Sequence, residues 1–548
     1  MTRPVTRRTD LLALGLAASL MATSALAQPA AGPNGEALAD EQTFSYRLLD
    51  QFPTLDPQLN EETAGSHVIR QIFEPLLIQD EKGELVPGVA ESFEASEGNT
   101  VYTFKLREDA RWSNGEPVTA QDFVYAWRRA ADPETASPYA WYVELAQIEN
   151  AAEIVAGEAD PETLGVEAVD DRTLKVTLEQ PLPYFPAMTT YATFSPVPQA
   201  VVEEFGDDWT SPANIVSNGA YTLEELALNE FFRLEKNPEY WDAENVYIDE
   251  VTGYVINDAN QSLTRWKAGE FDMLEPLPNG AFPGLQKEYP EQAHSVPRLC
   301  SYYYAFNFRD EADPAIKDPR VRKALSLAID RDVIVNQVMQ GGQTPAFTYA
   351  HAATAGFDVP DIEYANMTQA ERDAMAKELL EEAVAEGGIE EPITLDLIYN
   401  TSDEHKQIAT IVAQMWKQKL GVETNLSNYE WQTYLDMRKE GGFDVARSAW
   451  CADYNEASSF LDLLTTPHGN NDGKFSNARY DEIMTESKSA EDPQPLYTEA
   501  EEIIAGEAAI APIYHYANAF LLDDAIKGFP YENAENNWYV KNFYRVAE

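Results

Sequence analysis

No glycine- or proline-rich linker interrupts this chain. Its 548 residues exceed what one ordinary hydrophobic core organises, and at roughly 150 residues per domain they predict about three domains. The 28 Gly and 33 Pro are dispersed rather than gathered into a tether, and no internal repeat is present. We therefore expect domains that are connected by crossovers within one packed body.

The chain is strongly acidic. It has 39 Lys and Arg against 93 Asp and Glu, which gives a formal net charge of −54. This charge disfavours binding to nucleic acid and docking on anionic lipid. The 44% hydrophobic and 11% aromatic residues indicate a globular protein rather than a disordered one. The acidity by itself indicates solubility, so no ligand is inferred from it.

Residues 1–27 have the three parts of a secretory signal peptide. A basic head with Arg7-Arg8 precedes an apolar run over 11–22, and Ala25-Leu26-Ala27 forms a cleavage site. The apolar run is shorter than the ~20 residues that cross a bilayer. We expect a soluble, exported protein, located in the periplasm if the source is a Gram-negative bacterium. No Cys lies near the cleavage site, so a lipoprotein is not expected; general and twin-arginine export both stay open.

The only two cysteines are Cys300 and Cys451. In an oxidising compartment a lone pair is a disulfide candidate. The alternative that the sequence leaves open is two unrelated buried thiols.

Hydrophobic patterning indicates a mixed α/β chain. Alternation predicts strands over 101–107, 174–178 and 443–450, and Thr119 with Asp122 three residues later predicts a helix start.

Two longer helices are also expected. The first covers 320–339. The second follows a capping box at 401–404, buries one apolar face and ends at Gly421. The residues expected on that face are Ile408, Ile411, Val412, Met415 and Trp416.

No catalytic or metal-binding constellation is evident. The six His form no closely spaced ligand pair, and no GxSxG motif is present. The segment 469–475 lacks the spacing and the Ser/Thr of a phosphate loop, so it is interpreted as a polar turn. We expect no cofactor, no metal and no enzymatic activity.

Two segments resemble a known family. In residues 90–123 a strand is followed by Arg107-Glu108, Trp112, an Asn-Gly turn and a capped helix. This order is similar to that of the large extracytoplasmic solute-binding proteins, family 5, which serve ABC importers of peptides and nickel. Residues 443–455 (FDVARSAWCADYN) resemble the ligand clamp of the oligopeptide-binding branch of that family.

Further segments agree in order along nearly the whole mature chain. They are LDPQLNEE (55–62), ASPYAWY (136–142), SNGAYTL (217–223), LCSYYYAFN (299–307), NTSDEHK (400–406), NYEWQTYLDMR (428–438) and APIYHYAN (511–518).

The resemblance implies an α/β fold with two lobes of the type II periplasmic-binding kind, which close on a ligand like a Venus flytrap. The first lobe would be discontinuous, with an additional α/β domain, and the second would carry most ligand-binding residues. The implied boundaries are 43–73, 199–299 and 518–548 for lobe I, 74–198 for the additional domain II, and 300–517 for lobe III.

The resemblance also implies how the two ends of a peptide are held. Asp453 matches a carboxylate that pairs with the free α-amino group; a buried ammonium needs such a partner. Arg447, Arg438 and His405 match groups for the peptide carboxylate at different peptide lengths. Without the resemblance, Asp453 is better explained as a turn or cap residue. The alternative for Arg438 is a solvated helix charge, and that for His405 is a surface residue at a helix start, where the helix dipole disfavours its protonation.

Other matching positions concern the walls of the site. Glu61 matches an acid near the ligand, and the family places a disulfide between the equivalents of Cys300 and Cys451. The positions that match aromatic pocket walls, with core packing as the alternative, are Trp431, Trp450, Tyr139 and Tyr516. Tyr302 and Tyr303 are weaker candidates that could lie along the peptide backbone.

Three positions depart from the family pattern. Ala449 stands where Gly is typical, Thr63 where an apolar residue is usual, and His515 in a run that is often Tyr. They bear on side-chain preference and on how closely a peptide backbone approaches.

The resemblance therefore implies the substrate-binding component of a peptide ABC importer. It would take peptides of about two to five residues, as a monomer, and deliver them to a membrane permease with its own ATPase subunits. Murein peptides, glutathione and nickel stay open as alternative ligands, although scattered His disfavour nickel. A hydrolase on the same scaffold and a holdase-like chaperone are alternatives of other classes.

Overall fold

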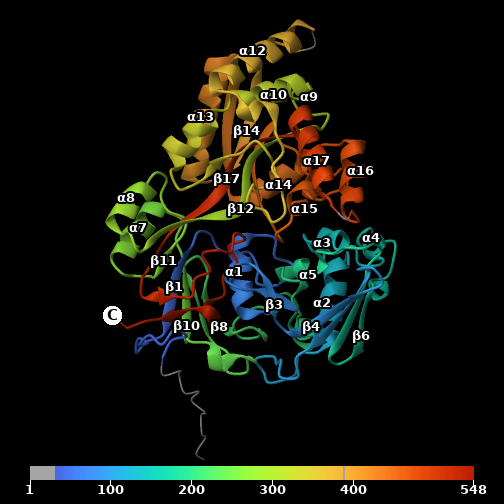
Figure 1. Cartoon of the computed structure of the whole chain (residues 1–548), viewed down its shortest axis with the longest axis vertical. Coiled ribbons are helices and arrows are strands. Elements are labelled where there is room, and N and C mark those ends of the chain that lie inside the picture. The colour runs from blue at the N-terminus through green and yellow to red at the C-terminus, as the bar shows by residue number, and fades with distance from the viewer. Residues whose placement is uncertain (1–30, 387–388, 491, 548) are drawn as a thin grey trace, which may run out of the picture.

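The computed structural model describes residues 31–386, 389–490 and 492–547; the predicted signal peptide lies outside them. Two lobes are stacked along the longest axis, and the chain passes between them more than once (Figure 1). The lower lobe contains β1, β8–β10 and a separate four-stranded sheet, and the upper lobe contains β14–β16 and the helices α10–α17. The α/β, two-lobed fold expected from the sequence is confirmed.

One sheet extends through both lobes. Its strand order is β15-β14-β16-β12-β17-β11-β1-β10-β9-β8, and β13 pairs with β17 beside this path. The strands are β1 (Thr43–Leu48), β8 (Tyr221–Ala227), β9 (Phe231–Lys236), β10 (Glu250–Val255), β11 (Met273–Leu274), β12 (Ala293–Phe306), β13 (Thr344–Pro345), β14 (Thr394–Asn400), β15 (Glu423–Tyr429), β16 (Val445–Cys451) and β17 (Ile510–Leu522).

The long antiparallel pair β12–β17 joins the lobes. Its register runs from Ala293 opposite Leu521, in the lower lobe, to Ala305 opposite Ile510, in the upper lobe. The register shifts between Pro297 and Ser301 and again between Tyr302 and Tyr303; such irregularities locally disrupt and bend a ladder. The lobes are thus connected by crossovers and not by a flexible tether, as expected.

Helices cover the sheet of the upper lobe. Trp416 of α13 is fully buried, and its indole N–H donates to the carbonyl of Leu325 in α10 at 2.9 Å. The helices are α9 (Pro314–Lys317), α10 (Pro319–Ala328), α11 (Arg331–Val333), α12 (Gln369–Ala385), α13 (Asp403–Leu420), α14 (Trp431–Glu440), α15 (Ser458–Leu461), α16 (Ala478–Ser487) and α17 (Gln494–Glu507).

Two expectations about these helices need correction. The segment 320–339 is not one helix, because Ile329 is extended and ends α10, and the chain continues through α11 and a π-helical stretch, Ile334–Met339. The buried guanidinium of Arg331 fills this break and donates to the carbonyls of Ser326 and Ala346.

The prediction of a capping box at 401–404 is also wrong. Ser402 is the N-cap of α13 without a side-chain hydrogen bond, because Thr401 donates to Tyr429 and Glu404 accepts from Tyr514. The end of α13 at Gly421, which is left-handed, is as predicted. Of the expected apolar face, Ile408, Val412 and Trp416 are buried, whereas Ile411 and Met415 are half-buried.

The lower lobe contains a second sheet with the order β4-β5-β7-β6. The predicted capping box of its helix α2 is present, with Asp122 accepting from the Thr119 backbone at 2.7 Å. The predicted strands at 101–107, 174–178 and 443–450 correspond to β5, β7 and β16. The lobe's further elements are α1 (Thr63–Ile72), β2 (Leu77–Gln79), β3 (Leu85–Pro87), β4 (Ala90–Ser96), β5 (Val101–Leu106), α2 (Ala120–Ala131), α3 (Ala140–Leu145), α4 (Ala151–Val155), β6 (Val166–Asp170), β7 (Thr173–Thr177), α5 (Phe185–Met188), α6 (Gln199–Phe205), α7 (Ala259–Lys267), α8 (Phe282–Glu288), β18 (Ile526–Lys527) and β19 (Tyr544–Arg545).

The two cysteines form a disulfide. Cys300 and Cys451 lie directly opposite each other on the neighbouring antiparallel strands β12 and β16, with their Cα atoms 3.9 Å apart. The bond covalently ties a strand that crosses between the lobes to a strand of the upper lobe. It closes a loop with a sequence separation of 151 residues.

Removing this bond is expected to destabilise the fold. The Cys300→Ser/Cys451→Ser double variant should lose about 2–5 kcal/mol of unfolding free energy, because the unfolded chain regains the entropy of a long closed loop. Urea denaturation checks this, with dithiothreitol-reduced wild-type protein as the matched control. Identical midpoints for oxidised wild type and variant would contradict it.

Candidate binding site

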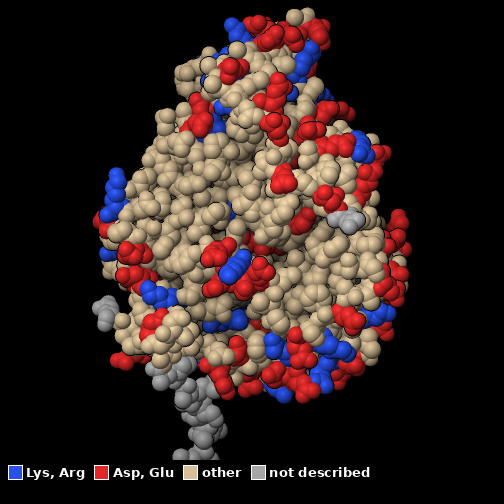
Figure 2. Space-filling view, viewed as in Figure 1, with Lys and Arg blue, Asp and Glu red and all other residues tan. Residues whose placement is uncertain are grey.

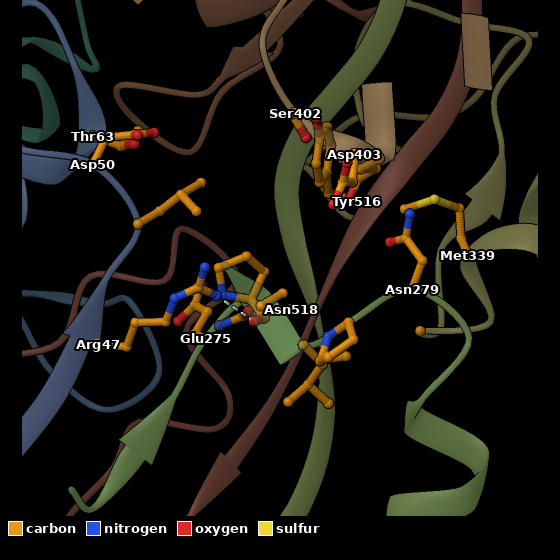
Figure 3. A pocket seen from close by; sticks show the side chains of 18 of the residues that line it. Arg47, Asp50, Thr63, Glu275, Asn279, Met339, Ser402, Asp403, Tyr516 and Asn518 are labelled. Carbon is orange, nitrogen blue, oxygen red and sulfur yellow. Dashed lines mark hydrogen bonds between the residues drawn. The ribbon is translucent and has the colours of Figure 1, made fainter. Parts of the chain in front are cut away.

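A cavity of about 580 Å³ lies between the lobes, within the ~300–1,000 Å³ typical of small-ligand sites. The lower lobe contributes the end of β1 and the segment 273–282, and the upper lobe contributes the start of α13 and Arg447 of β16. Residues 516–519 of the crossing strand β17 also line it. Figure 3 shows polar side chains from these segments pointing into it.

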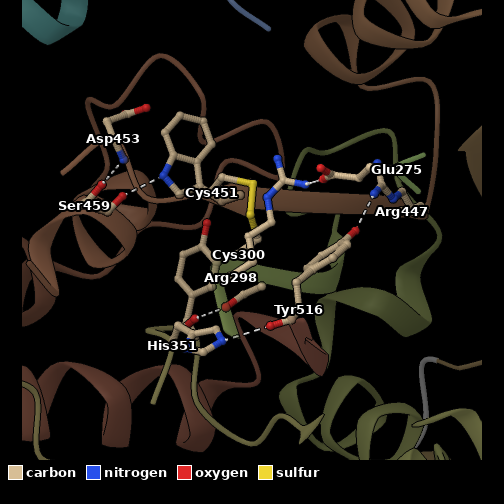
Figure 4. The surroundings of a disulfide bond; sticks show 12 residues. Glu275, Arg298, Cys300, His351, Arg447, Cys451, Asp453, Ser459 and Tyr516 are labelled. Atoms are coloured by element: carbon tan, nitrogen blue, oxygen red, sulfur yellow. Dashed lines mark hydrogen bonds and ion pairs between the residues drawn. A yellow bond between two sulfur atoms is a disulfide. The ribbon is translucent and has the colours of Figure 1, made fainter. Parts of the chain in front are cut away.

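Arg447 is the cation of the upper-lobe wall. It is 8% exposed, and its guanidinium donates to Asn400 Oδ1 at 3.2 Å and to Tyr516 Oη at 3.0 Å (Figure 4). It also lies 4.9 Å from the ring centroid of Tyr302. No carboxylate forms an ion pair with Arg447 among the described residues, and its buried Nε has no hydrogen-bond partner there. Arg447 is therefore able to bind an anion that enters the cavity.

His405 lines the same wall from the first turn of α13. Burial, and then the nearby Arg447 charge, hold the pKa of His405 well below its usual value. Its Nδ1 is buried and has no hydrogen-bond partner in the described part of the chain. His405 is consequently neutral near pH 7 and contributes a hydrogen bond rather than a charge.

Asp453 lies outside this cavity, in the turn after β16. It is 7% exposed; its Oδ1 accepts from Tyr139 Oη at 3.4 Å and its backbone N–H donates to Ser459 Oγ at 2.8 Å. Burial raises the pKa of the Asp453 carboxyl well above its usual value. The hydroxyl groups of Tyr139 and Tyr191 partly oppose that rise. Within the described residues this buried carboxyl has hydroxyl partners and no cationic one.

The lobes touch each other around Asp453. Trp141 of α3 lies 6.0 Å from Trp450 and 4.4 Å from His468 between ring centroids. Tyr184 and Tyr454 are stacked at 5.4 Å. A weaker ion pair joins Glu61 of the lower lobe to Lys439 of the upper lobe at 3.4 Å. These contacts hold the lobes in a closed arrangement.

Tyr516 and Thr63 also line the cavity, whereas Arg438, Trp431, Trp450 and Ala449 do not. Arg438 forms a largely buried ion pair with Asp472, away from the cavity. Trp431 packs beside Tyr434, and the Trp450 indole donates to the Ser459 carbonyl at 2.7 Å. Ala449 is half-buried and stands opposite Tyr302 on β12.

His515 and His351 form a stacked pair behind Tyr516, with centroids 4.6 Å apart. His515 Nδ1 accepts from the Ala352 N–H, and His351 Nδ1 accepts from the Ala353 N–H. Burial lowers the pKa of His351 to about 4 and, together with the neighbouring His351, that of His515 to about 3. Both rings are thus neutral supports for the strand that carries Tyr516.

Sequence reasoning missed the charged groups of the lower-lobe wall, Arg47, Asp50, Glu275 and Arg298. Arg298 stands two residues before Cys300, so its closeness to the disulfide motif was a usable signal. Glu275 and Arg47 lie in segments without a motif. Among the described residues no group of three or more His, Cys, Asp or Glu is arranged to hold a metal.

Comparison with known proteins identifies the family. Residues 84–472 match the family described as bacterial extracellular solute-binding proteins, family 5. The chain is 44% identical, over 98% of both sequences, to the periplasmic oligopeptide-binding protein OppA of Salmonella typhimurium. This chain belongs to family 5 of the extracellular solute-binding proteins. Its periplasmic relatives indicate the same location, and no described helix has the length and apolarity to cross a membrane.

Solved structures agree with this assignment. The murein tripeptide-binding protein MppA of Escherichia coli superposes with a TM-score of 0.89 at 42% identity, covering 93% of this chain and 100% of that one. The OppA of Haemophilus influenzae in complex with the peptide RPPGFSPFR superposes with a TM-score of 0.87 at 37% identity, covering 93% of this chain and 100% of that one. The unliganded open form of MppA gives 0.71 at 42% identity, covering 94% and 99%. The lower score against an open form agrees with the closed arrangement of the lobes.

The buried histidine pair predicts a pH dependence of stability. In the folded protein His351 has a pKa of about 4, whereas in the unfolded chain its pKa is about 6.5. The folded protein therefore binds this proton less readily than the unfolded chain does. The contribution of neutral His351 to the free energy of unfolding is fully present above pH 6.5 and is lost as the pH falls towards 4. The stability advantage of wild type over His351→Gln should therefore shrink by about 1.4 kcal/mol per pH unit in this window.

Urea titrations of both proteins at several pH values measure that difference directly. The titrating groups other than His351 and its neighbour His515 are common to both proteins in the same surroundings, so their contributions cancel. A difference that stays constant between pH 7 and 4 would contradict a neutral, buried His351.

Proposed function

We propose that this protein captures short peptides with a free amino terminus in the periplasm and delivers them to an ABC permease. The observation that carries the proposal is Asp453, a buried carboxyl at the lobe contact with no cationic partner among the described residues. A buried carboxylate is costly unless it is paired. The α-amino group of a peptide supplies the missing positive charge.

Arg447 supplies the complementary end. It is the upper-lobe cation on the cavity wall, and it carries hydrogen-bond donors but no carboxylate partner in the described structure. A peptide carboxylate fits its planar fork. His405 beside it is a neutral, weaker partner, and Arg438 would have to leave Asp472 to take part. Peptides of about two to five residues would thus be held between the Asp453 carboxylate and the Arg447 guanidinium.

We further propose that residues 43–73, 199–299 and 518–548 form lobe I, 74–198 the additional domain and 300–517 lobe III. Closure about β12 and β17 would enclose the peptide. The protein would act as a monomer, exported by its signal peptide and not lipid-anchored. In this proposal the protein binds peptides and makes or breaks no bond. The closed, loaded form would dock on a permease served by ATPase subunits.

Murein peptides are the second candidate ligand. The similarity to the structure of the murein tripeptide-binding protein MppA, at a TM-score of 0.89, supports murein peptides as ligands. They also present a free amino end, so the same Asp453 clamp serves them. The two candidates differ in the body of the ligand and not in the capture of its amino terminus.

Asp453→Asn is expected to weaken the binding of tripeptides such as Ala-Ala-Ala by at least about 100-fold, because it removes the charge that pairs with the buried ammonium. Calorimetric titration of ligand-stripped protein measures this. Asp310→Asn, at an exposed site that contacts Lys317, is the matched control and should bind as wild type does. Equal affinities of wild type and Asp453→Asn would contradict the proposal.

Arg447→Gln tests the other end through a double-mutant cycle. Wild type should bind a tripeptide carboxylate at least about tenfold more tightly than its C-terminal amide, because the amide lacks the charge that Arg447 pairs with. In Arg447→Gln this ratio should approach one. A ratio that persists in the variant would assign the carboxylate to another group.

A further inference from the structure

Besides Asp50, three charged side chains of the lower lobe line the cavity without a role in the clamp just described. They are Arg47 at the end of β1, Glu275 after β11, and Arg298 on β12. Figure 3 shows Arg47 and Glu275 close together at one side of the cavity, and Figure 4 shows Arg298 between Glu275 and the disulfide. The two arginines differ in how many hydrogen bonds hold them.

Arg47 is fixed. Its guanidinium donates to the carbonyls of Ile256 at 2.7 Å, Pro276 at 2.8 Å and Asn257 at 3.0 Å. With three backbone acceptors and 3% exposure, it does not turn towards a ligand. It is instead a fixed positive charge whose field reaches Asp50, Asp258 and Glu275.

Arg298 is loosely held. Its one hydrogen bond in the described structure is a long contact from Nη1 to Glu275 Oε1 at 3.4 Å. Its Nε is buried and has no partner among the described residues. A guanidinium carries five N–H donors in a rigid fork, so most of its donor capacity is unused while it lines a ligand-sized cavity. Such a group is suited to a second carboxylate.

The neighbouring charges allow that exchange. If Arg298 turns to an incoming carboxylate, Glu275 still lies in the positive field of Arg47, which it shares with Asp50 and Asp258, and is not left as an isolated anion. The other cavity carboxyls lie elsewhere on the wall. Asp50 is beside Thr63, and Asp403 is beside Ser402, both apart from Glu275 in Figure 3. Glu404 lines the upper-lobe wall next to Asp403 and accepts from the Tyr514 hydroxyl.

We propose that Arg298 is a specificity-determining residue that binds a carboxylate carried by the body of the captured peptide, so that the site prefers acidic peptides. This inference rests on the proposed function, because it adds a third contact to a peptide held at both ends. The same chemistry is presented by the side chain of an α-linked Glu and by the free α-carboxylate of a γ-linked Glu, the linkage found in murein peptides.

The test is calorimetric titration of ligand-stripped protein with matched tripeptides. Glu and its neutral isostere Gln are placed in turn at each position of Ala-Ala-Ala, and Ala-γ-D-Glu-Ala supplies the γ-linked form. At one position at least, wild type should prefer Glu over Gln by about tenfold or more, the factor that one charge-assisted hydrogen bond supplies. A preference confined to the γ-linked peptide would keep Arg298's role and assign the ligand to the murein type.

Variants locate the effect. In Arg298→Gln the Glu-to-Gln affinity ratio should fall to near one, and in Glu275→Gln, where the competing carboxylate is gone, it should rise above that of wild type. The rise keeps the test decisive even if Arg298→Gln folds poorly. Arg265→Gln removes a half-buried lower-lobe cation that pairs with Glu270 and does not line the cavity, and should leave the ratio unchanged.

Two outcomes would overturn the inference. One is a wild-type ratio near one at every position and in both linkages. The other is a preference for Glu that survives in Arg298→Gln. Failure of the proposed function is distinguishable from both, because the neutral Ala-Ala-Ala peptide would then not bind to any of the proteins.

Discussion

The structure depends on the pairing of β12 with β17. These two strands cross from one lobe to the other while they stay hydrogen-bonded, so the lobes share one ladder instead of a tether. The site residues are arranged around this pair: Arg447 on the neighbouring strand β16, Tyr516 on β17 and Arg298 on β12. The disulfide fixes β16 to β12 between Arg447 and the turn that carries Asp453. The two ends of the proposed clamp are therefore held at a defined separation.

The charges of the site contrast with those of the surface. Carboxylates are spread over the visible face of the molecule (Figure 2), where water and salt screen them. Inside, each ionisable group has only a few specific neighbours. Asp453 accepts from a tyrosine hydroxyl, and Arg447 donates to the Asn400 amide oxygen and the Tyr516 hydroxyl. Arg298 has one long contact with Glu275. An acidic protein can thus bind an anionic group, because burial and local partners decide the local field.

Most local patterns were predictable from the sequence. Long-range side-chain pairings were not, apart from the disulfide that the family resemblance implied. The strand at 101–107 and the capped helix after Thr119 follow from residue spacing alone. The helix expected over 320–339 is broken because Arg331 finds buried carbonyl partners from distant segments, and the capping box at 401–404 fails because Glu404 binds Tyr514, more than a hundred residues away. For the same reason the sequence located Asp453 and Arg447 through a motif but missed Glu275 and Arg47, which only the tertiary fold brings to the cavity.

The most direct measurement compares free and N-acetylated forms of the same tri-, tetra- and pentapeptides, titrated calorimetrically into protein stripped of bound ligand by partial unfolding. The account predicts dissociation constants of about 1 μM or below for free peptides, and no measurable binding after acetylation, since the amide no longer carries the charge that pairs with Asp453. Equal binding of both forms, or no binding of either, would contradict capture by the amino terminus.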